Sequence, residues 1–296
     1  MRNRWVIAVC AKGEMLKIIS WNLNQQPRAW AALLESGADL ALVQEACTPP
    51  AEIANCITVD LTPWHTAGAG MMRPWRAAVV RLNSNLEVQW YEAKSITEAA
   101  PRELAVSRLG TLGAAEVLDP VTGEKLVLIS MYSCWERPHN STGSEWIYAD
   151  ASAHRLISDL SVFIGQQRGH RIIAAGDLNI LYGYGEYGSP YWAQRYRSVF
   201  DRMAALGLEF VGPQAPNGQQ ADPWPKELPR DSENVPTFHT NRQTPATSTR
   251  QLDFVFASSD VARRVVVRAL NDPSQWGPSD HCRIAIEVPD SGPTST

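Results

Sequence analysis

Short apolar segments with the β-branched residues that favour strands recur along the 296-residue chain, and no other feature limits its fold as strongly. They are more numerous than one flat twisted sheet carries comfortably. The longer helical signals lie at 149–166 and 191–206. The sequence therefore predicts an α/β fold with four layers, in which two stacked mixed β-sheets lie between flanking helices.

The folded pattern begins with a strand, a helix and a second strand. The run LKIISWNLN at 16–24 is apolar and β-branched until it ends in polar residues, as a buried strand does. After it, Trp30, Leu33 and Leu34 share one face of a predicted helix, and the apolar run ADLALVQE follows at 38–45. A strand, a helix and a strand within about thirty residues usually place two parallel strands side by side.

Further strands are predicted over the rest of the chain. Their ranges are 76–81, 86–91, 113–117, 125–131, 171–175, 252–257, 265–269 and 283–288. The stretch 212–250 breaks this pattern, because it is rich in Pro, Gln, Asn and Thr and has one apolar and aromatic island at 235–238. Loops of this length are usually functional or disordered, so we interpret the stretch as a surface excursion that contributes to substrate binding.

The charge balance limits how the chain can bind a polyanion. With 27 Lys and Arg against 31 Asp and Glu, the formal net charge is -4, so no overall positive field is available. Binding of nucleic acid would then need a local patch or a metal. The 5 cysteines contain no CxxC pair, which argues against a disulfide framework and a cysteine zinc site. We therefore expect reduced thiols and a cytoplasmic location.

The first residues of the chain resemble a signal peptide only in part. Two arginines precede the apolar run 5–11, but Lys12 and Glu14 stand where a small-residue cleavage site would lie, so secretion is not favoured. No apolar run approaches the roughly 18 residues that cross a bilayer, and no membrane span is expected. The predicted organisation is a leader or edge segment at 1–14, one domain at 15–290 and a C-terminal tail at 291–296.

Acidic and amide side chains follow or precede several predicted strands at their ends. Asn22 and Glu45 end the first two strands, Asp177 and Asn179 come after a third, and the tripeptide Ser-Asp-His at 279–281 precedes the last. If these ends meet along one edge, their carboxylates, amides and imidazole converge. Such hard oxygen ligands are the ones that Mg²⁺ or Mn²⁺ prefers, so the pattern predicts a divalent metal site.

Each of these residues alone has a purely structural alternative. Asn22 is equally typical of a turn, Glu45 of an exposed carboxylate, and Asp177 of an Asx turn. Asp253 could likewise be a structural buried acid, but it lies within an apolar predicted strand, where an ionised acid needs a partner to offset its desolvation. His281 would supply that partner, and the joint occurrence of these residues favours a catalytic site.

The segments SWNLN, LVQE, SMYS, GDLN, QLDFVF and SDH occur in this order over residues 16–288. The series resembles the endonuclease/exonuclease/phosphatase superfamily, which includes abasic-site endonucleases, pancreatic-type DNases, inositol polyphosphate 5-phosphatases and neutral sphingomyelinases. The resemblance implies a phosphodiester hydrolase that depends on Mg²⁺ or Mn²⁺. It also implies nucleic acid as the leading substrate, and we expect a monomer.

The resemblance assigns the metal to one set of residues and the proton transfer to another. It implies that Glu45 is the principal metal ligand, that Asn22 nearby helps to hold the metal or the phosphate, and that Asp280 lies close to the metal. The same resemblance implies that Asp177 orients or deprotonates the attacking water. Together these groups would offset the negative charge of the pentacovalent transition state.

Three further roles follow from the same resemblance. It implies that Asn179 binds a phosphate oxygen, that His281 contacts the scissile phosphate as a general acid or base, and that Asp253 fixes the tautomer of this histidine. A buried carboxylate behind an imidazole raises its pKa and favours the cation that binds phosphate.

The sequence departs from the family pattern at Tyr132, where the tyrosine is followed by Ser133 instead of a nearby proline. Tyr132 then either touches phosphate or packs against the domain. The island PTFHTNR resembles a nuclease loop in which an aromatic residue lies near a nucleotide, so Phe238 or His239 is expected to stack on a base.

Two other functions compete with a nuclease. A phosphatase or phospholipase-type phosphodiesterase would be expected to show extra basic residues near the site or an apolar membrane-facing hairpin, and neither is obvious. A noncatalytic binding module would be expected to lose a metal ligand or the histidine, and none of these residues is replaced. The sequence therefore favours catalysis and leaves the substrate open between nucleic acid and a small or lipid phosphoester.

Overall fold

A computed structural model describes residues 15–68, 71–101, 103–118, 123, 125–164 and 170–289. The predicted leader at 1–14 and the predicted tail at 291–296 lie outside the described residues, as does the end of the helix predicted at 149–166. The single domain predicted at 15–290 stays a prediction. Among the described residues, no helix combines the length and apolar character that a membrane crossing requires.

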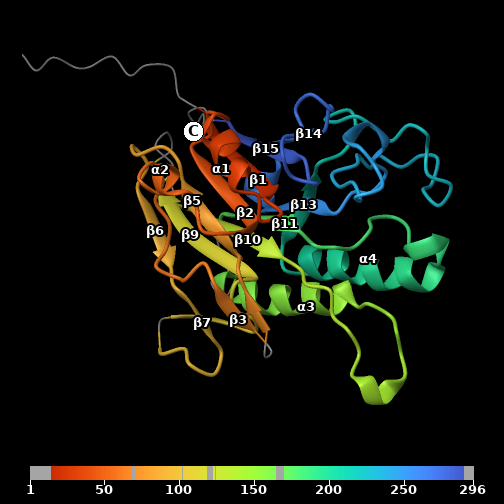
Figure 1. Cartoon of the computed structure of the whole chain (residues 1–296), viewed down its shortest axis with the longest axis horizontal. Helices are drawn as coiled ribbons and strands as arrows, with labels where there is room; N and C mark the ends of the chain where they lie inside the picture. The colour runs from red at the N-terminus through yellow and green to blue at the C-terminus, as the bar shows by residue number, and fades with distance from the viewer. Residues whose placement is uncertain are drawn as a thin grey trace, which may run out of the picture.

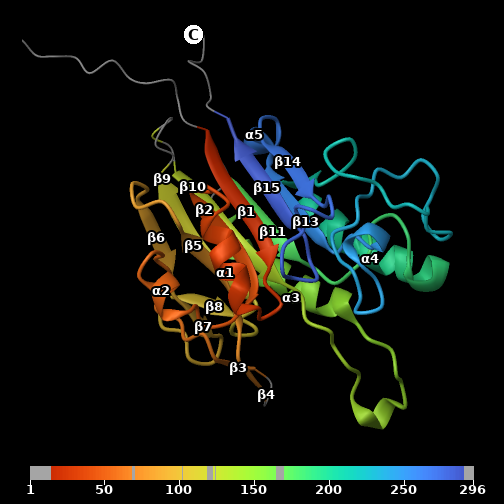
Figure 2. The same cartoon turned by 45° about the horizontal axis from the view of Figure 1, so that its top comes forward.

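The first large sheet carries the start and the end of the described chain side by side (Figure 2). Within the described residues it has five strands in the order β14-β15-β1-β2-β5. Their bounds are β1 Leu16–Asn22, β2 Leu40–Ala46, β5 Arg76–Arg81, β14 Val266–Leu270 and β15 Arg283–Val288. β1 pairs in parallel with β2 and antiparallel with β15, so the predicted strand-helix-strand unit is confirmed.

The second large sheet has six strands within the described residues, in the order β12-β13-β11-β10-β9-β6. Their bounds are β6 Val88–Tyr91, β9 Leu112–Leu118, β10 Lys125–Tyr132, β11 Ile172–Asp177, β12 Leu208–Gly212 and β13 Asp253–Ser258. β10 and β11 are parallel, whereas β11 and β13 are antiparallel with Asp177 opposite Asp253. The strand that begins at Asp253 therefore starts at the edge where β11 ends.

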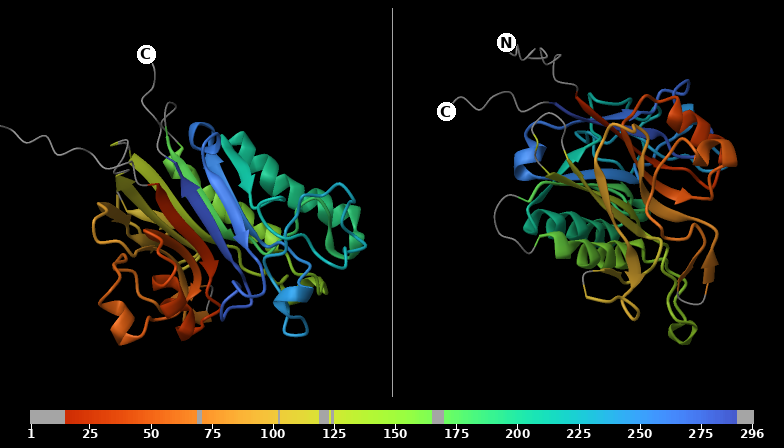
Figure 3. Two further views of the ribbon diagram at one scale, coloured as in Figure 1. Left: turned by 90° about the horizontal axis from the view of Figure 1, so that it is seen from above. Right: turned by 90° about the vertical axis from the view of Figure 1, so that its left-hand side faces the viewer.

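Helices cover the outer faces of both sheets (Figure 1, Figure 3). The α-helices are α1 Pro27–Leu34, α2 Ala51–Ala54, α3 Ala149–Leu160, α4 Pro190–Ala205 and α5 Ser259–Ala262. The short 3-10 helices are η1 Asn140–Thr142, η2 Ser161–Phe163, η3 Glu186–Gly188 and η4 Pro245–Thr247. The remaining short strands are β3 Thr66–Gly68, β4 Met71–Arg73, β7 Ala93–Ser95 and β8 Leu104–Val106.

Three apolar cores separate the four layers. Leu42 and Val255 lie in the core between the two sheets, whereas Trp30 belongs to the core beneath α1. Phe200 of α4 packs on Phe254 in the third core, beneath α3 and α4. Full burial of a large apolar side chain contributes about 1.5–3 kcal/mol, so these cores fix the layers. The predicted four-layered α/β sandwich is confirmed.

The stretch 212–250 lies largely at the surface, as the sequence predicts, but it also has a buried part. Val235 and Thr237 are completely buried, and Phe238 forms β-bridges with Arg250 and His281. The polar composition does not reveal this buried part, in which polar side chains hold an irregular backbone. Asn234, for example, donates from its amide to the Tyr182 carbonyl oxygen at 2.7 Å.

Candidate functional site

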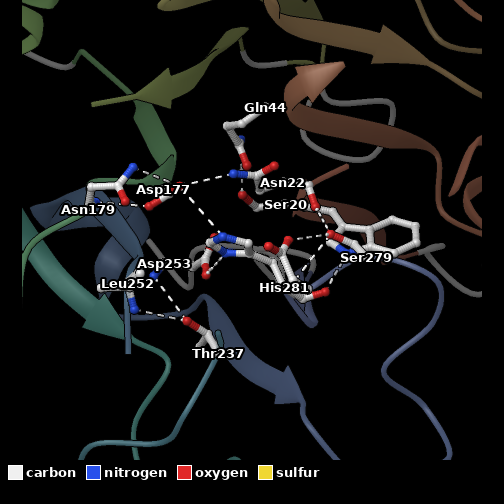
Figure 4. A network of polar contacts seen from close by, with 12 residues as sticks. Ser20, Asn22, Gln44, Asp177, Asn179, Thr237, Leu252, Asp253, Ser279 and His281 are labelled. Carbon is white, nitrogen blue, oxygen red and sulfur yellow. Dashed lines mark hydrogen bonds and ion pairs between the residues drawn. The ribbon is translucent and has the colours of Figure 1, made fainter. Parts of the chain in front are cut away.

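The candidate site lies at one edge of the two stacked sheets, where strand ends from both meet (Figure 4). In the parallel pair, β1 ends at Asn22 and β2 has Glu45 just before its last residue, and β11 of the other sheet ends at Asp177. β13 begins at Asp253, and His281 precedes β15. Strand pairing alone therefore brings residues far apart in the sequence to one edge.

His281 forms a buried ion pair with Asp253. Its Nδ1 lies 2.8 Å from Asp253 Oδ2, and both side chains are almost fully buried. The carboxylate accepts the Nδ1 proton, which leaves Nε2 as the free ring atom, and Nε2 is 3.7 Å from Asp177 Oδ2. The Phe238 ring covers the imidazole with 4.9 Å between centroids. The imidazole is thus fixed in one tautomer and one orientation.

The two buried acids decide the charge of this imidazole. Burial by itself would lower the pKa of His281, but the Asp253 and Asp177 carboxylates raise it to about 10. Burial also raises the pKa of Asp177 to about 7, and repulsion from Asp253 adds to this, although the His281 cation opposes it. An imidazolium therefore lies beside a carboxyl group that exchanges its proton near neutral pH.

Asp177 is held by two asparagines. Its Oδ2 accepts hydrogen bonds from Asn22 Nδ2 and Asn179 Nδ2, each at 3.0 Å, and its Oδ1 accepts the Asn179 backbone N–H at 2.9 Å. The Asn22 amide also donates to Glu45 Oε1 at 3.3 Å, so it bridges the two acids. The side-chain Oδ1 of Asn22 accepts the Asn24 backbone N–H at 2.9 Å, which sets the direction of the amide.

Asn179 has all its hydrogen-bonding groups occupied in this arrangement. Its amide donates to the Ser133 carbonyl oxygen at 2.9 Å as well as to Asp177, and its Oδ1 accepts the Trp135 indole N–H at 2.8 Å. Because an indole nitrogen only donates, Trp135 fixes which way the amide faces. Asn179 would have to release Ser133 or Asp177 before it could donate to a phosphate oxygen.

Glu45 lies at an irregularity of β2, where the pairing with β5 shifts between Val43 and Ala46. Its φ of 44° is uncommon for a residue with a side chain, and bulges of this kind redirect side chains next to active sites. Glu45 is half-buried, and its Oε2 accepts the Gln25 amide at 3.3 Å. The bulge therefore turns the carboxylate out of the ladder toward the site.

The acids of this edge are suited to a divalent cation. Among the described residues, Glu45 has amide donors but no ion-pair partner, and the carboxylates of Glu45, Asp177, Asp253 and Asp280 outnumber the single imidazole. Within the same residues, no three His, Cys, Asp or Glu are grouped as a complete metal cage. Mg²⁺ is commonly held by one or two carboxylates, waters and substrate phosphates, so the donor set fits that ion.

The segment before β15 is tied directly to the end of β1. Ser279 Oγ donates to the Asn22 carbonyl oxygen at 2.7 Å, and the His281 backbone N–H donates to the same Oγ at 3.2 Å. The buried Trp21 indole donates to the His281 carbonyl oxygen at 2.9 Å. Asp280, whose carboxylate lies 3.4 Å from Ser279 Oγ, is placed at the edge by these contacts.

Gly176 shows why a glycine precedes Asp177. Its φ is 154°, and a Cβ there would lie only 1.9 Å from the Met131 carbonyl oxygen. No side chain fits such a close approach between the β11 and β10 backbones. The glycine therefore lets β11 stay paired with β10 up to the Asp177 carboxylate.

The aromatic residues that the sequence singled out lie at different places. Tyr132 is half-buried against Trp75, with 4.7 Å between ring centroids, and burial together with Glu45 raises its pKa well above the usual value. Phe238 packs on His281, as described above. The His239 ring instead faces the buried Trp276, with 5.5 Å between ring centroids, and its Nδ1 lies 3.0 Å from the Thr240 carbonyl oxygen.

Three residues of the site were not predicted. Trp135 holds Asn179, Thr237 holds the start of β13, and Ser279 holds the end of β1. Only Ser279 had a signal in the sequence, because it belongs to the SDH motif. The other two lie in irregular segments, where spacing does not predict contacts.

The fold is similar to several solved structures. An AP endonuclease from Leishmania major has a TM-score of 0.61 at 17% identity, over 93% of this chain and 87% of that one. The endonuclease domain of TRAS1, a telomere-specific non-LTR retrotransposon, has a TM-score of 0.59 at 17% identity, over 94% and 100%. A 3′ phosphatase from Neisseria bound to product DNA hairpin has a TM-score of 0.54 at 16% identity, over 93% and 99%. At these identities the likeness shows the fold alone.

The sequence itself matches one family over most of its length. None of the curated protein sequences matches the chain significantly. The match to the endonuclease/exonuclease/phosphatase family, however, extends over residues 19–281, from the first strand to the histidine of the site. The activities in that family name are all hydrolyses of phosphate esters. The predicted resemblance is confirmed, and the chain belongs to the endonuclease/exonuclease/phosphatase family.

Proposed function

We propose that this protein is a phosphodiester hydrolase that depends on a divalent metal and acts on nucleic acid. The observation that carries the proposal is the continuous buried network from Asp253 through His281 and Asp177 to Asn22 and Glu45. Buried acids and a charged imidazole that meet at a strand edge are typical of catalytic sites. Two of the similar solved structures are endonucleases, and a third is a 3′ phosphatase with bound DNA.

His281 binds the scissile phosphate in this proposal. Its Nδ1 is committed to Asp253, so the Nε2–H is the one that can donate to a phosphate oxygen. The raised pKa keeps the imidazole charged at neutral pH, and the cation offsets the charge that develops on phosphorus. Asp253 acts as a positioning residue, because it holds the tautomer and stabilises the cation.

Asp177 accepts a proton from the attacking water. A general base works best when its pKa lies close to the operating pH, and burial raises the pKa of Asp177 to about 7. The amides of Asn22 and Asn179 hold the carboxylate still, so the water that it binds has a fixed direction toward phosphorus.

Glu45 and Asp280 would hold the divalent cation, with oxygens of the substrate completing its coordination. When bound, such an ion neutralises charge on the phosphoryl oxygens and polarises the P–O bond. Asn22 keeps Glu45 at a defined distance from Asp177 through its bridging amide. The direct ligand role that the sequence predicts for Asn22 stays a prediction.

A substrate panel tests this proposal. Plasmid, single-stranded DNA, RNA, abasic duplex, nucleotide, inositol phosphate and sphingomyelin are each incubated with Mg²⁺, Mn²⁺ or EDTA. We expect hydrolysis of at least one nucleic acid with a metal and none with EDTA. Cleavage of the lipid or the inositol phosphate without any cleavage of nucleic acid would overturn the choice of substrate.

The proposed quaternary state and location need separate tests. We propose a cytoplasmic monomer, as the composition predicts. Sedimentation velocity of the purified chain tests the monomer, and a dimer there would contradict it. Fractionation of the producing cells tests the location, and export would contradict it.

A further inference from the structure

A cavity of about 770 Å³ opens beside the catalytic network. It begins at Asn179, Phe238 and Leu252, which also touch the network, and its far wall comes from the connection between β10 and α3 and from the start of α4. Its volume lies within the roughly 300–1,000 Å³ typical of ligand sites. The cavity is thus continuous with the place where the phosphate would bind.

Aromatic rings form much of the wall. Trp135, Trp146 and Tyr187 line the cavity although 61%, 55% and 87% of their respective surfaces are exposed. The Trp146 ring packs on the buried Trp192, another residue of the wall, with 5.6 Å between ring centroids. Large rings that are left in water next to a site, and held in place, are typical of a binding surface.

The charge of the wall excludes a phosphate and favours a neutral ring. Arg250 is paired with Glu186, with Nη2 at 2.9 Å from Oε2, so its positive charge is already neutralised. The other charged residue in the wall is Glu145, which is exposed. A carboxylate repels phosphate but accepts hydrogen bonds from the amino groups of bases.

A nucleotide matches both ends of this arrangement. Its phosphate would bind at His281. Its base is joined to that phosphate by one sugar, so the base would extend past Phe238 into the aromatic cavity. We infer that this cavity binds an unpaired nucleobase next to the scissile phosphate, so the preferred substrate is a single-stranded or locally unpaired nucleic acid. The inference rests on the proposed function and adds the substrate class.

A duplex would not use this cavity. A paired base is stacked inside the helix and must leave it before it can enter a pocket. The chain also has a net charge of -4, which provides little of the phosphate attraction that dominates duplex binding. Stacking on aromatic rings, by contrast, uses the face of the base, which every base has, so it tolerates different nucleotide sequences.

The test uses Trp146, which lines the cavity, packs its ring on Trp192 and donates its backbone N–H to Ser144 Oγ. Trp146→Ala removes the ring, Trp146→Phe keeps a smaller one, and Val162→Ala is the control. Val162 is equally exposed, at 62%, and follows α3, whose first residue lines the cavity. At about 1.5 Å per helical residue, Val162 lies roughly 20 Å from Ala149, just beyond the end of α3.

Steady-state kinetics with Mg²⁺ or Mn²⁺ compare a single-stranded oligonucleotide, the same strand without the base beside the cleaved phosphate, and the matching duplex. We expect Trp146→Ala to raise KM for the intact strand about tenfold, in line with the loss of one stacked base. Removal of the base from the strand should raise KM of the wild-type enzyme by a similar factor. It should raise KM of Trp146→Ala little further. Trp146→Phe should recover most of the loss, and Val162→Ala should behave as wild type.

Three results would overturn the inference while leaving hydrolysis intact. The first is an unchanged KM of Trp146→Ala for the intact strand, and the second is additive effects of the ring and the base. The third is faster cleavage of the duplex than of the strand. Cleavage of bis(p-nitrophenyl) phosphate by the wild type reports the proposed function separately, since its absence from every metal condition would count against hydrolysis itself.

Discussion

The edge that carries the acids and the cavity beside it are built in opposite ways. Asp177, Asp253 and His281 are buried, come from or adjoin paired strands, and contact one another directly. The cavity wall instead comes largely from the connection 133–148, which reaches away from the sheets (Figure 1), and from exposed rings such as Trp146. In the proposed function, rigid strands would position the reacting groups, whereas loops that tolerate change would provide the recognition.

The largest effects should come from the rigid edge. We expect Asp177→Asn or His281→Ala to lower kcat at least about a hundredfold, as is typical for the loss of general acid-base chemistry. Rates are measured with the best substrate of the panel at saturating metal.

The fold should survive both substitutions. Each residue lies at a strand end and contributes no apolar side chain to the cores. Circular dichroism and thermal unfolding check this point. A variant that is folded and retains near-wild-type turnover would remove its residue from the mechanism, and the contrast between edge and cavity would then disappear.

Asp253→Asn tests the support behind the histidine, and we expect a smaller loss of roughly tenfold to a hundredfold in kcat. The carboxylate of Asp253 is the strongest factor that raises the pKa of His281 to about 10. Without it, that pKa should fall, although Asp177 and Asp280 still favour the cation. NMR titration of the imidazole in EDTA measures the shift directly, and an unchanged value would contradict the assignment.

The same variant has a defined effect on stability against pH. Because folding raises the pKa of His281 above its ordinary value, the stabilisation is complete below about pH 6.5 and is lost as the pH rises through about 10. The difference in the free energy of unfolding between wild type and Asp253→Asn should therefore be largest near pH 6 and narrow toward pH 10. Urea unfolding in EDTA at several pH values checks the sign.

The sequence predicted the edge better than the cavity for a physical reason. Asn22, Glu45 and Asp177 were found because strand ends are marked by a change from apolar to polar residues, and pairing then brings them together. The orientation of Asn179 was not predictable, since it depends on the indole of Trp135 in an irregular segment. Periodicity gives the position of a side chain on a strand but not the contacts that a loop makes.

The same reason explains the errors in the fold. β12 was missed because its five residues follow α4 after a short turn and alternate only weakly between buried and exposed positions. The surface placement of 212–250 holds for most of its residues, but the polar composition gave no sign of the buried part at 234–237. Thr237 shows what composition hides, since its hydroxyl is buried and serves the backbone of β13.

Thr237→Val tests this hidden link between the long loop and the edge. Thr237 Oγ1 accepts the backbone N–H groups of Leu252 at 3.0 Å and Asp253 at 3.1 Å. Valine has the same shape but leaves both buried donors without an acceptor, so we expect a loss of about 1–3 kcal/mol in the free energy of unfolding. Chemical denaturation measures it, and Thr237→Ser should restore most of it. An unchanged midpoint for Thr237→Val would show that the loop does not support the edge.

The smallest expected effect lies at the junction of the two regions, at Trp135. Its indole holds Asn179 and its ring lines the cavity, so Trp135→Phe removes the hydrogen bond while keeping a ring. One such bond has a net value of about 0.5–1.5 kcal/mol, and we expect kcat to fall about twofold to tenfold because Asp177 loses part of its support. KM should stay within about twofold of wild type, since stacking persists. If KM rises and kcat does not change, Trp135 belongs to recognition alone, and the rigid edge ends at Asn179.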